Sequence, residues 1–173
     1  MAARKLRWAL PCGILLGAGS LLALDVPQSR REFVEAVASG EHAAKMERFV
    51  FERDFDRVYA DVARQSSACL DPEVKRSGFV GGQMEVSSSS YHPTLKRLAG
   101  SAAEFTLQVV HRPRGIGATP PPGGLYVMAA DLKSLGKGRT EVVLYRPTIG
   151  FKKIAESLKE WAAGEGDDCP KLR

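Results

Sequence analysis

The first 24 residues limit what the rest of the chain can fold into. Arg4, Lys5 and Arg7 precede an uncharged apolar run of 17 residues, Trp8–Leu24, and polar sequence begins at Asp25. A short basic segment followed by an apolar stretch is typical of an export signal. The run is shorter than the roughly 20 residues that a membrane-spanning helix needs. We therefore expect about 150 folded residues outside the cytosol, which suit one domain with a single core.

The leader has three open fates. A cut after Ser20 would place Ala18 and Ser20 where a signal peptidase accepts small residues, and this is the first interpretation. The second is an uncleaved anchor through residues 8–24, which would be the protein's only contact with a membrane. The third is a lipoprotein with a lipid on Cys12, although Pro11 stands where a small residue is expected. The first interpretation predicts a periplasmic or secreted protein.

The charge of the chain argues against nucleic acid as a partner. There are 25 basic and 20 acidic residues, a net charge of +5. Three of the basic residues lie in the leader, so 22 against 20 remain beyond it and the excess falls to +2. A domain that follows a phosphate backbone needs Lys and Arg clustered on one face. The charges here are interspersed, as in residues 52–57, and we expect no nucleic-acid binding.

Three segments have helical patterns. Ser29 and Glu32 form a capping box at the start of a short helix, which Gly40 is placed to end. Apolar residues recur at spacings of three, four and seven over 55–70, which indicates a helix with one buried stripe. A similar stripe runs over 151–163.

Five runs have the patterns of strands. Residues 46–52 place Phe49 and Phe51 on one face, and the short turn at 136–138 implies that the last two strands form an antiparallel hairpin. Four later runs follow, of which the first, Gln83–Tyr91, is polar and fits an edge strand. The other three carry apolar residues at alternate positions. The later runs are Gln83–Tyr91, Glu104–Arg112, Leu125–Leu132 and Thr140–Arg146.

This order of elements predicts an α+β fold. An antiparallel sheet of about four or five strands, with the two long amphipathic helices packed on one face, would bury every apolar stripe. The chain then divides into the leader at 1–24, an N-terminal helical arm at 25–45 and a single α+β domain at 46–173.

The predicted domain resembles helix-grip domains, in which a long C-terminal helix lies across a curved antiparallel sheet. The resemblance rests on the order of elements over residues 46–164, from the strand with Phe49 and Phe51 to the helix that ends at Ala163. BamC-like lipoproteins of the outer-membrane assembly machinery, START-type lipid carriers and small envelope proteins are similar in this order. No family motif accompanies it, so the resemblance assigns no functional residue.

Cys69 and Cys169 are the cysteines that lie beyond the leader. An even pair in an oxidising compartment normally forms a disulfide. A metal-binding or redox pair is less favoured, because the two are far apart in sequence and form no C-x-x-C motif. We predict a structural disulfide that ties the C-terminal tail to the first long helix.

The sequence contains no pattern that points to catalysis. His42, His92 and His111 are far apart and have no metal-ligand spacing, and no Gly-x-Ser-x-Gly elbow occurs. We expect a protein that is not an enzyme, with no catalytic residues, no metal site and no cofactor.

The long Pro-rich loop at 112–124 is the first candidate binding region. Long loops are commonly functional or disordered, and consecutive prolines favour a stiff extended path. Arg112, Arg114 and Ile116 could meet a partner or an anionic surface. We expect a binding or scaffolding module of the envelope, whose partner is another envelope protein.

The alternative function is that of a carrier for an apolar or lipid ligand. A helix that lies across a curved sheet can leave a cavity between the two. Such a cavity would be lined by apolar residues of the sheet and the C-terminal helix, namely Phe105, Met128, Leu144, Ile154 and Trp161. A carrier needs room beside these side chains, whereas a scaffold fills that space.

Overall fold

The computed structural model describes residues 26–40, 44–112 and 119–172. Within these ranges, no helix is both long enough and apolar enough to span a membrane. The helices are α1 (Arg30–Ala38), α2 (Phe55–Cys69) and α3 (Lys152–Ala163). The strands are β1 (Ala44–Phe51), β2 (Glu73–Val80), β3 (Gln83–Leu98), β4 (Ala102–Arg112), β5 (Leu125–Gly136) and β6 (Arg139–Pro147).

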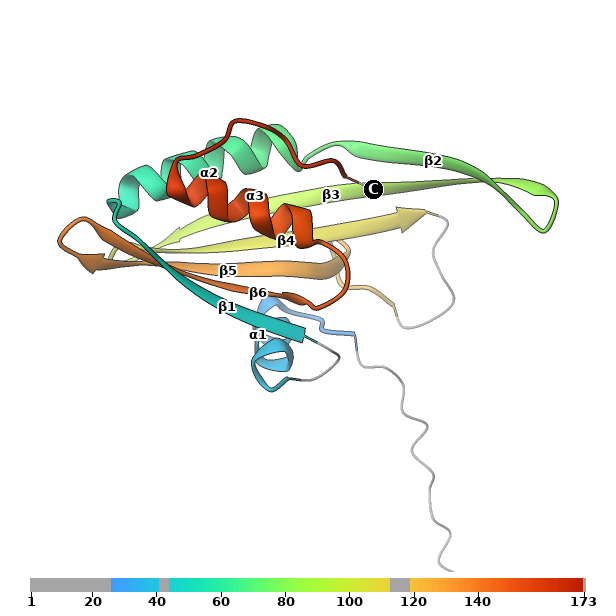
Figure 1. Cartoon of the computed structure of the whole chain (residues 1–173). Coiled ribbons are helices and arrows are strands. Elements are labelled where there is room, and N and C mark those ends of the chain that lie inside the picture. Colours follow the sequence, from blue (N-terminus) through green and yellow to red (C-terminus); the bar gives the residue numbers. More distant parts are fainter. Residues whose placement is uncertain (1–25, 41–43, 113–118, 173) are drawn as a thin grey trace, which may run out of the picture.

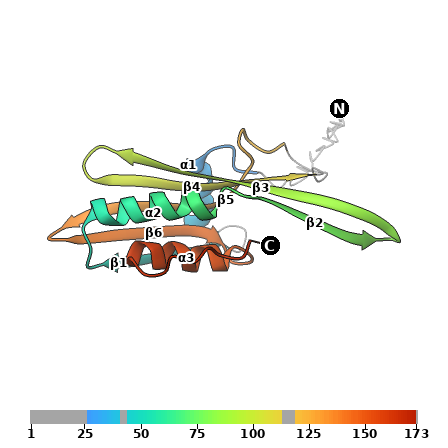
Figure 2. The same ribbon diagram turned by 90° about the horizontal axis from the view of Figure 1, so that it is seen from above.

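All six strands form one antiparallel sheet in the order β1-β6-β5-β4-β3-β2. Strands β2 to β6 are consecutive neighbours, and β1 lies at the far edge beside β6. The helices α2 and α3 lie side by side on one face of the sheet, and α1 lies on the opposite face (Figures 1 and 2). The α+β class and the two long helices on one face are therefore confirmed.

The sheet has one strand more than predicted. We missed β2, because its sequence carries Lys75, Arg76 and Gly78 rather than a regular apolar alternation. A Gly81-Gly82 pair joins β2 to β3, with φ of 59° and 83°. Two positive φ values suit a tight two-residue hairpin turn. The run Gln83–Tyr91 is consequently not an edge strand, since β2 pairs with it on the outside.

Strand β3 also runs past the predicted end, through Pro93 to Leu98. Proline lacks an amide hydrogen and is confined to parts of a sheet where a donor is not required. The pairing with β2 stops at Ser90, so Pro93 lies in the half of β3 whose only strand neighbour is β4. The strand can therefore continue through a residue that would interrupt a central strand.

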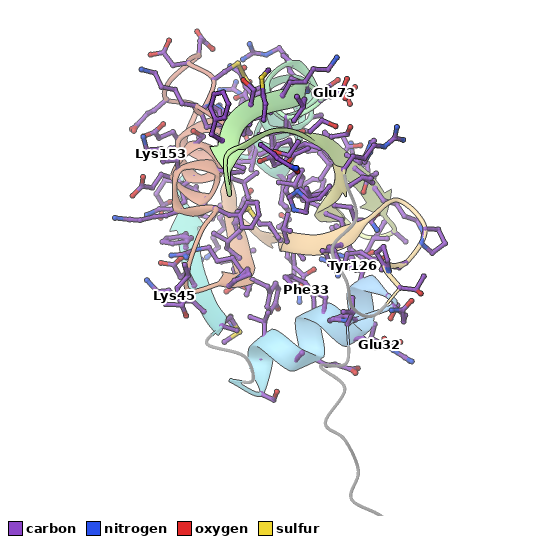
Figure 3. The ribbon with its side chains drawn as sticks, turned by 90° about the vertical axis from the view of Figure 1, so that its right-hand side faces the viewer. Glu32, Phe33, Lys45, Glu73, Tyr126 and Lys153 are labelled. Carbon is purple, nitrogen blue, oxygen red and sulfur yellow. A yellow bond between two sulfur atoms is a disulfide. The ribbon has the colours of Figure 1, made fainter. Side chains whose placement is uncertain are left out.

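Apolar residues are buried on both faces of the sheet. Between the sheet and α2 and α3, the largest fully buried side chains include Trp161, Phe105 and Leu70. On the opposite face, Phe33 of α1 is buried against the sheet, and its ring stacks on that of Tyr126 at 6.1 Å between centroids (Figure 3). The three helices therefore cover the central strands from both sides.

Polar contacts fix the orientation of α1. Arg30 pairs with Asp131 of β5 and, at 3.4 Å, with Glu104 of β4. The hydroxyl of Tyr145 donates to the second oxygen of Asp131 at 3.1 Å. Burial raises the pKa of Tyr145, and the Asp131 carboxylate adds to the increase. The phenol therefore stays a neutral donor in the ordinary pH range.

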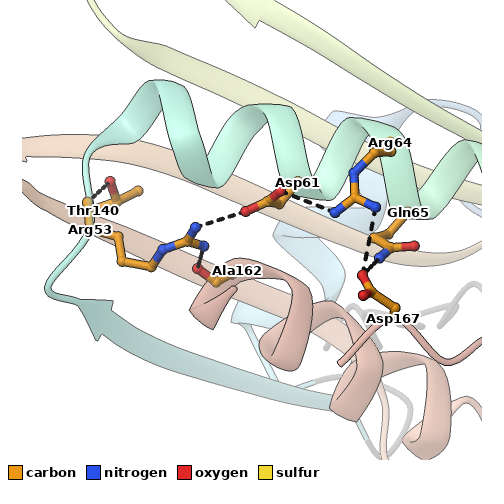
Figure 4. A network of polar contacts seen from close by, with 7 residues as sticks. All are labelled: Arg53, Asp61, Arg64, Gln65, Thr140, Ala162 and Asp167. Atoms are coloured by element: carbon orange, nitrogen blue, oxygen red, sulfur yellow. Dashed lines mark hydrogen bonds and ion pairs between the residues drawn. The ribbon is translucent and has the colours of Figure 1, made fainter. Parts of the chain in front are cut away.

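A second polar network joins α2 to α3 (Figure 4). Arg53 donates to the carbonyl of Ala162 at 2.9 Å and to the carboxylate of Asp61 at 2.8 Å. Its own carbonyl accepts from the hydroxyl of Thr140 at 2.8 Å. Gly164 ends α3 with a φ of 76°, and a Cβ there would lie 2.5 Å from the Arg53 guanidinium carbon. Glycine thus allows both the left-handed helix end and the close approach of Arg53.

We expect the contribution of Asp61 to stability to depend on pH. The hydrogen bond from Arg53 holds the pKa of Asp61 below its ordinary value of 3.8, against the effect of burial, and Arg64 lowers it further. A lowered pKa in the folded state favours folding at pH values above 3.8, and this gain is lost as the pH falls through the folded-state pKa. Asp61→Asn should therefore lower the melting temperature at pH 7 and have progressively less effect in acid.

Thermal unfolding followed by circular dichroism from neutral to acid pH checks this prediction. Glu156→Gln is the matched control, because it breaks an exposed ion pair of α3 with Lys152 and should change stability little. A loss in Asp61→Asn that is the same at every pH would assign the effect to packing rather than to the charge.

Candidate interaction surface

Residues 73–90 form a two-stranded ribbon that projects beyond the rest of the sheet (Figures 1 and 2). Strand β2 pairs with Gln83–Ser90, whereas β4 pairs with β3 only from Ser88 onward. Residues 83–87 of β3 therefore have β2 as their one strand neighbour. An isolated two-stranded hairpin is only marginally stable in water, so the part of β3 that pairs with β4 supports the projecting part of the ribbon. Apart from Val74 at its base, which packs against the main core, the ribbon is an appendage of the fold.

Among the described side chains of the ribbon, three large apolar ones are exposed. The exposed fractions are 78% for Phe79, 64% for Met84 and 61% for Val86. Phe79 is opposite Met84 in the register, and Ser77 is opposite Val86. Opposite residues share a face of an antiparallel pair, and residues two apart along a strand share it too. All three apolar side chains therefore lie on one face, close to the tip.

A basic row lies behind these side chains on the same face. Lys75 is opposite Ser88, and Ser88 is opposite Arg112 of β4. Four residues of strand separate Phe79 from Lys75, which corresponds to roughly 13 Å. From tip to base, this face therefore passes from apolar side chains to cationic ones.

Arg112, the first residue of the predicted binding loop, belongs to this surface. Arg112 is the last residue of β4 and is exposed. Arg114 and Ile116 lie outside the described residues. We did not single out Phe79, Met84 or Val86 from the sequence. The signal was present, because Gly81-Gly82 between two short runs with β-forming residues is a two-residue hairpin pattern.

The five residues predicted to line a ligand cavity are packed in the core. Their exposed fractions lie between 0% and 4%, and all belong to the cluster between the sheet and the helices. A side chain that faces a cavity of ligand size keeps surface that a solvent-sized sphere can touch, even when the cavity is closed. The space beside these five side chains is therefore filled. They are Phe105, Met128, Leu144, Ile154 and Trp161.

Cys69 and Cys169 form a disulfide, with 5.1 Å between their Cα atoms. This is the pairing that the sequence predicts. Cys69 is the buried last residue of α2, and Cys169 lies in the tail after α3. The tail is also held by Asp167, which accepts from Gln65 at 2.6 Å and pairs with Arg64 at 3.6 Å (Figure 4). The disulfide and these contacts attach the end of the chain to α2.

Two further observations concern the polar groups of the described residues. In residues 26–40, 44–112 and 119–172, no group of three or more His, Cys, Asp or Glu could hold a metal ion. Burial is the main cause of the raised pKa values of Tyr91 and Tyr145. A raised pKa makes a phenol a weaker acid at neutral pH and does not prepare it as a nucleophile.

No family model matches the chain, and a search of curated proteins finds no match. Two solved structures are similar in outline. One is the allergen Ara h 8.0201, with 9% identity over 70% of this chain and 95% of that chain and a TM-score of 0.33. The other is the ZhuI aromatase/cyclase of Streptomyces sp. R1128, with 12% identity over 70% of this chain and 86% of that chain and a TM-score of 0.29. The helix-grip description therefore rests on the order and packing of this chain's own elements, and the resemblance to BamC stays a prediction.

Proposed function

We propose that this protein is an exported, non-catalytic binding module that attaches to its partner through the ribbon. The observation that carries the proposal is the set Phe79, Met84 and Val86 on one face of a projecting hairpin. Single exposed apolar residues are common on protein surfaces, but a contiguous apolar group on a protruding element is typical of an interaction site. Exposure of this kind favours aggregation unless a partner covers it.

Two features support export. The leader has the pattern of an export signal. The Cys69–Cys169 disulfide is of a kind that persists in oxidising compartments and is rare in the cytosol. Both support a location in which the ribbon can reach an envelope or extracellular partner.

Crosslinking in the cells that produce the protein tests the proposal. A photoreactive phenylalanine analogue at position 79 should form adducts on illumination, because the ribbon is covered by a partner. The same analogue at Thr94 is the matched control, since Thr94 is exposed on the corresponding face of β3 beyond the ribbon. Equal adduct yields from the two positions would contradict the proposal.

A stability measurement shows whether the ribbon is dispensable for folding. Phe79→Ser combined with Met84→Ser should leave the melting temperature within about 2 °C of the parent, because exposed side chains away from the core contribute within roughly 0.5 kcal/mol. Loss of the fold in this variant would mean that the two side chains pack against the domain.

The carrier function is the second candidate, and one observation favours it. Trp161 is 1% exposed, and among the described residues nothing accepts a hydrogen bond from its indole nitrogen. A buried unpaired donor is costly, and a ligand with a polar group could satisfy it. The close packing around Trp161 argues against the carrier function, because α3 would have to move to admit a ligand. Titration with a long-chain fatty acid, read by Trp161 fluorescence, should leave the emission unchanged if the protein is a binding module.

A further inference from the structure

We infer that the ribbon docks on the surface of an anionic lipid bilayer, with its tip among the acyl chains and its basic row at the lipid headgroups. The inference rests on the proposed function and specifies the chemistry of the partner. This contact is distinct from membrane contact through the N-terminal segment, because it is made by the hairpin of residues 73–90.

The tip has the composition of an element that enters a membrane interface. Residues 77–84 contain no charged residue. Phe79 and Met84 are opposite one another and are the most exposed large apolar residues among the described side chains of the ribbon. The two strands pair in a continuous register from Glu73–Ser90 to Val80–Gln83, and a Gly-Gly turn makes the tip narrow. A narrow apolar tip can enter the headgroup boundary without opening a large gap between lipids.

The spacing of the basic row matches the depth of the headgroup layer. Interfacial segments place apolar side chains roughly 5–10 Å into the boundary between headgroups and acyl chains. The Lys75–Ser88–Arg112 row lies roughly 13 Å behind Phe79 along the strand. Long basic side chains can bend back toward phosphates while their stems stay along the ribbon. Lys75 and Arg112 would therefore contact anionic headgroups when the tip is inserted. Glu73, which pairs with Lys75 at 3.8 Å, reduces the attraction of this row for anionic headgroups.

The alternative occupant, a second copy of the chain, fits less well. The outer edge of β2 could in principle pair with another strand, but it carries Lys75, Arg76 and Gly78 in its middle. Charges and glycine on an edge strand oppose such pairing. Face-to-face stacking of two ribbons would use three side chains that expose on the order of 100–150 Å² each, against about 800 Å² per partner in a stable protein interface. A bilayer needs no matching surface, because each side chain enters it independently.

Flotation of the purified protein with lipid vesicles tests the inference. We expect binding to vesicles of phosphatidylcholine mixed with phosphatidylglycerol and weaker binding to phosphatidylcholine alone. Phe79→Ser with Met84→Ser should reduce the affinity for the mixed vesicles at least about ten-fold. Lys75→Gln with Arg112→Gln should reduce it about ten-fold and abolish the preference for the anionic lipid. Lys96→Gln with Lys133→Gln removes the same charge from exposed positions away from the ribbon and should leave the binding unchanged.

A tryptophan probe separates ribbon insertion from any contact made by the N-terminal segment. Phe79→Trp should show a blue-shifted emission on mixed vesicles and strong quenching by brominated acyl chains, whereas Thr94→Trp should show neither. Trp8 and Trp161 are common to both variants and cancel in the comparison. Equal spectra for the two variants on vesicle-bound protein would overturn the lipid inference. If position 79 nevertheless forms crosslinks to a protein in cells, the binding module survives and the partner is that protein; absence of crosslinks would remove the binding module itself.

Discussion

Replacing both Cys69 and Cys169 with alanine is expected to lower the free energy of unfolding by about 2–5 kcal/mol. The disulfide closes a loop across a sequence separation of 100 residues. Opening that loop increases the conformational freedom of the unfolded chain, for which the chain-entropy relation gives about 5 kcal/mol as an upper figure. Urea denaturation of the double variant and of the parent measures the difference.

Reduction of the parent protein provides the control for this experiment. A reductant should bring the parent to the stability of the double variant and leave the variant unchanged. The tail would still be held by Asp167 through Arg64 and Gln65, so we expect the folded structure to persist. A loss below about 1 kcal/mol would mean that the disulfide contributes little beyond these polar contacts.

Trp161→Ala is the second change with a large expected effect, a loss of about 3–5 kcal/mol. The indole of Trp161 is the largest fully buried side chain and lies between α3 and the sheet. Removing it leaves a cavity in the centre of the main core, and the neighbouring elements can close it only in part. The same denaturation measurement applies.

Trp161→Phe separates the role of the ring from that of its N–H group. Since nothing among the described residues accepts from that nitrogen, the variant should lose less than half as much stability as Trp161→Ala. A loss in Trp161→Phe close to that of Trp161→Ala would show that the indole hydrogen bond is made and important. That result would also strengthen the carrier alternative.

Helical periodicity was the most reliable guide to the fold. The stripe from Phe55 to Leu70 and the stripe from Phe151 to Ala163 correspond to α2 and α3, and both helices pack on one face of the sheet. These helices bury one side each, so the 3.6-residue pattern survives in the sequence. The cysteine pair was equally informative, because two cysteines in an oxidising compartment leave a single pairing.

The ribbon could not be found by the same argument. Sequence patterns reveal strands through burial, and β2 has little burial to impose a pattern on Lys75, Arg76 or Phe79. The sequence also predicts too short a strand β3, because a proline such as Pro93 normally interrupts a central strand. Pro93 fits within β3 because the pairing with β2 ends before it.

The candidate site could be predicted from the sequence only in part. The cavity prediction followed from the idea that a helix across a curved sheet leaves space, but side chains such as Phe105 and Met128 fill it. Arg112 was identified as a cationic contact in the loop, and the register of β3 and β4 places it beside Ser88 at the base of the ribbon. The pairing register of β3 and β4 cannot be read from the sequence alone.

Adduct formation from position 79 in intact cells is the most direct test of the interaction surface. We expect abundant adducts from a photoreactive residue at position 79 and few from the same residue at position 94, with lipid among the products. Equal yields at the two positions would contradict the assignment of the ribbon as the binding element.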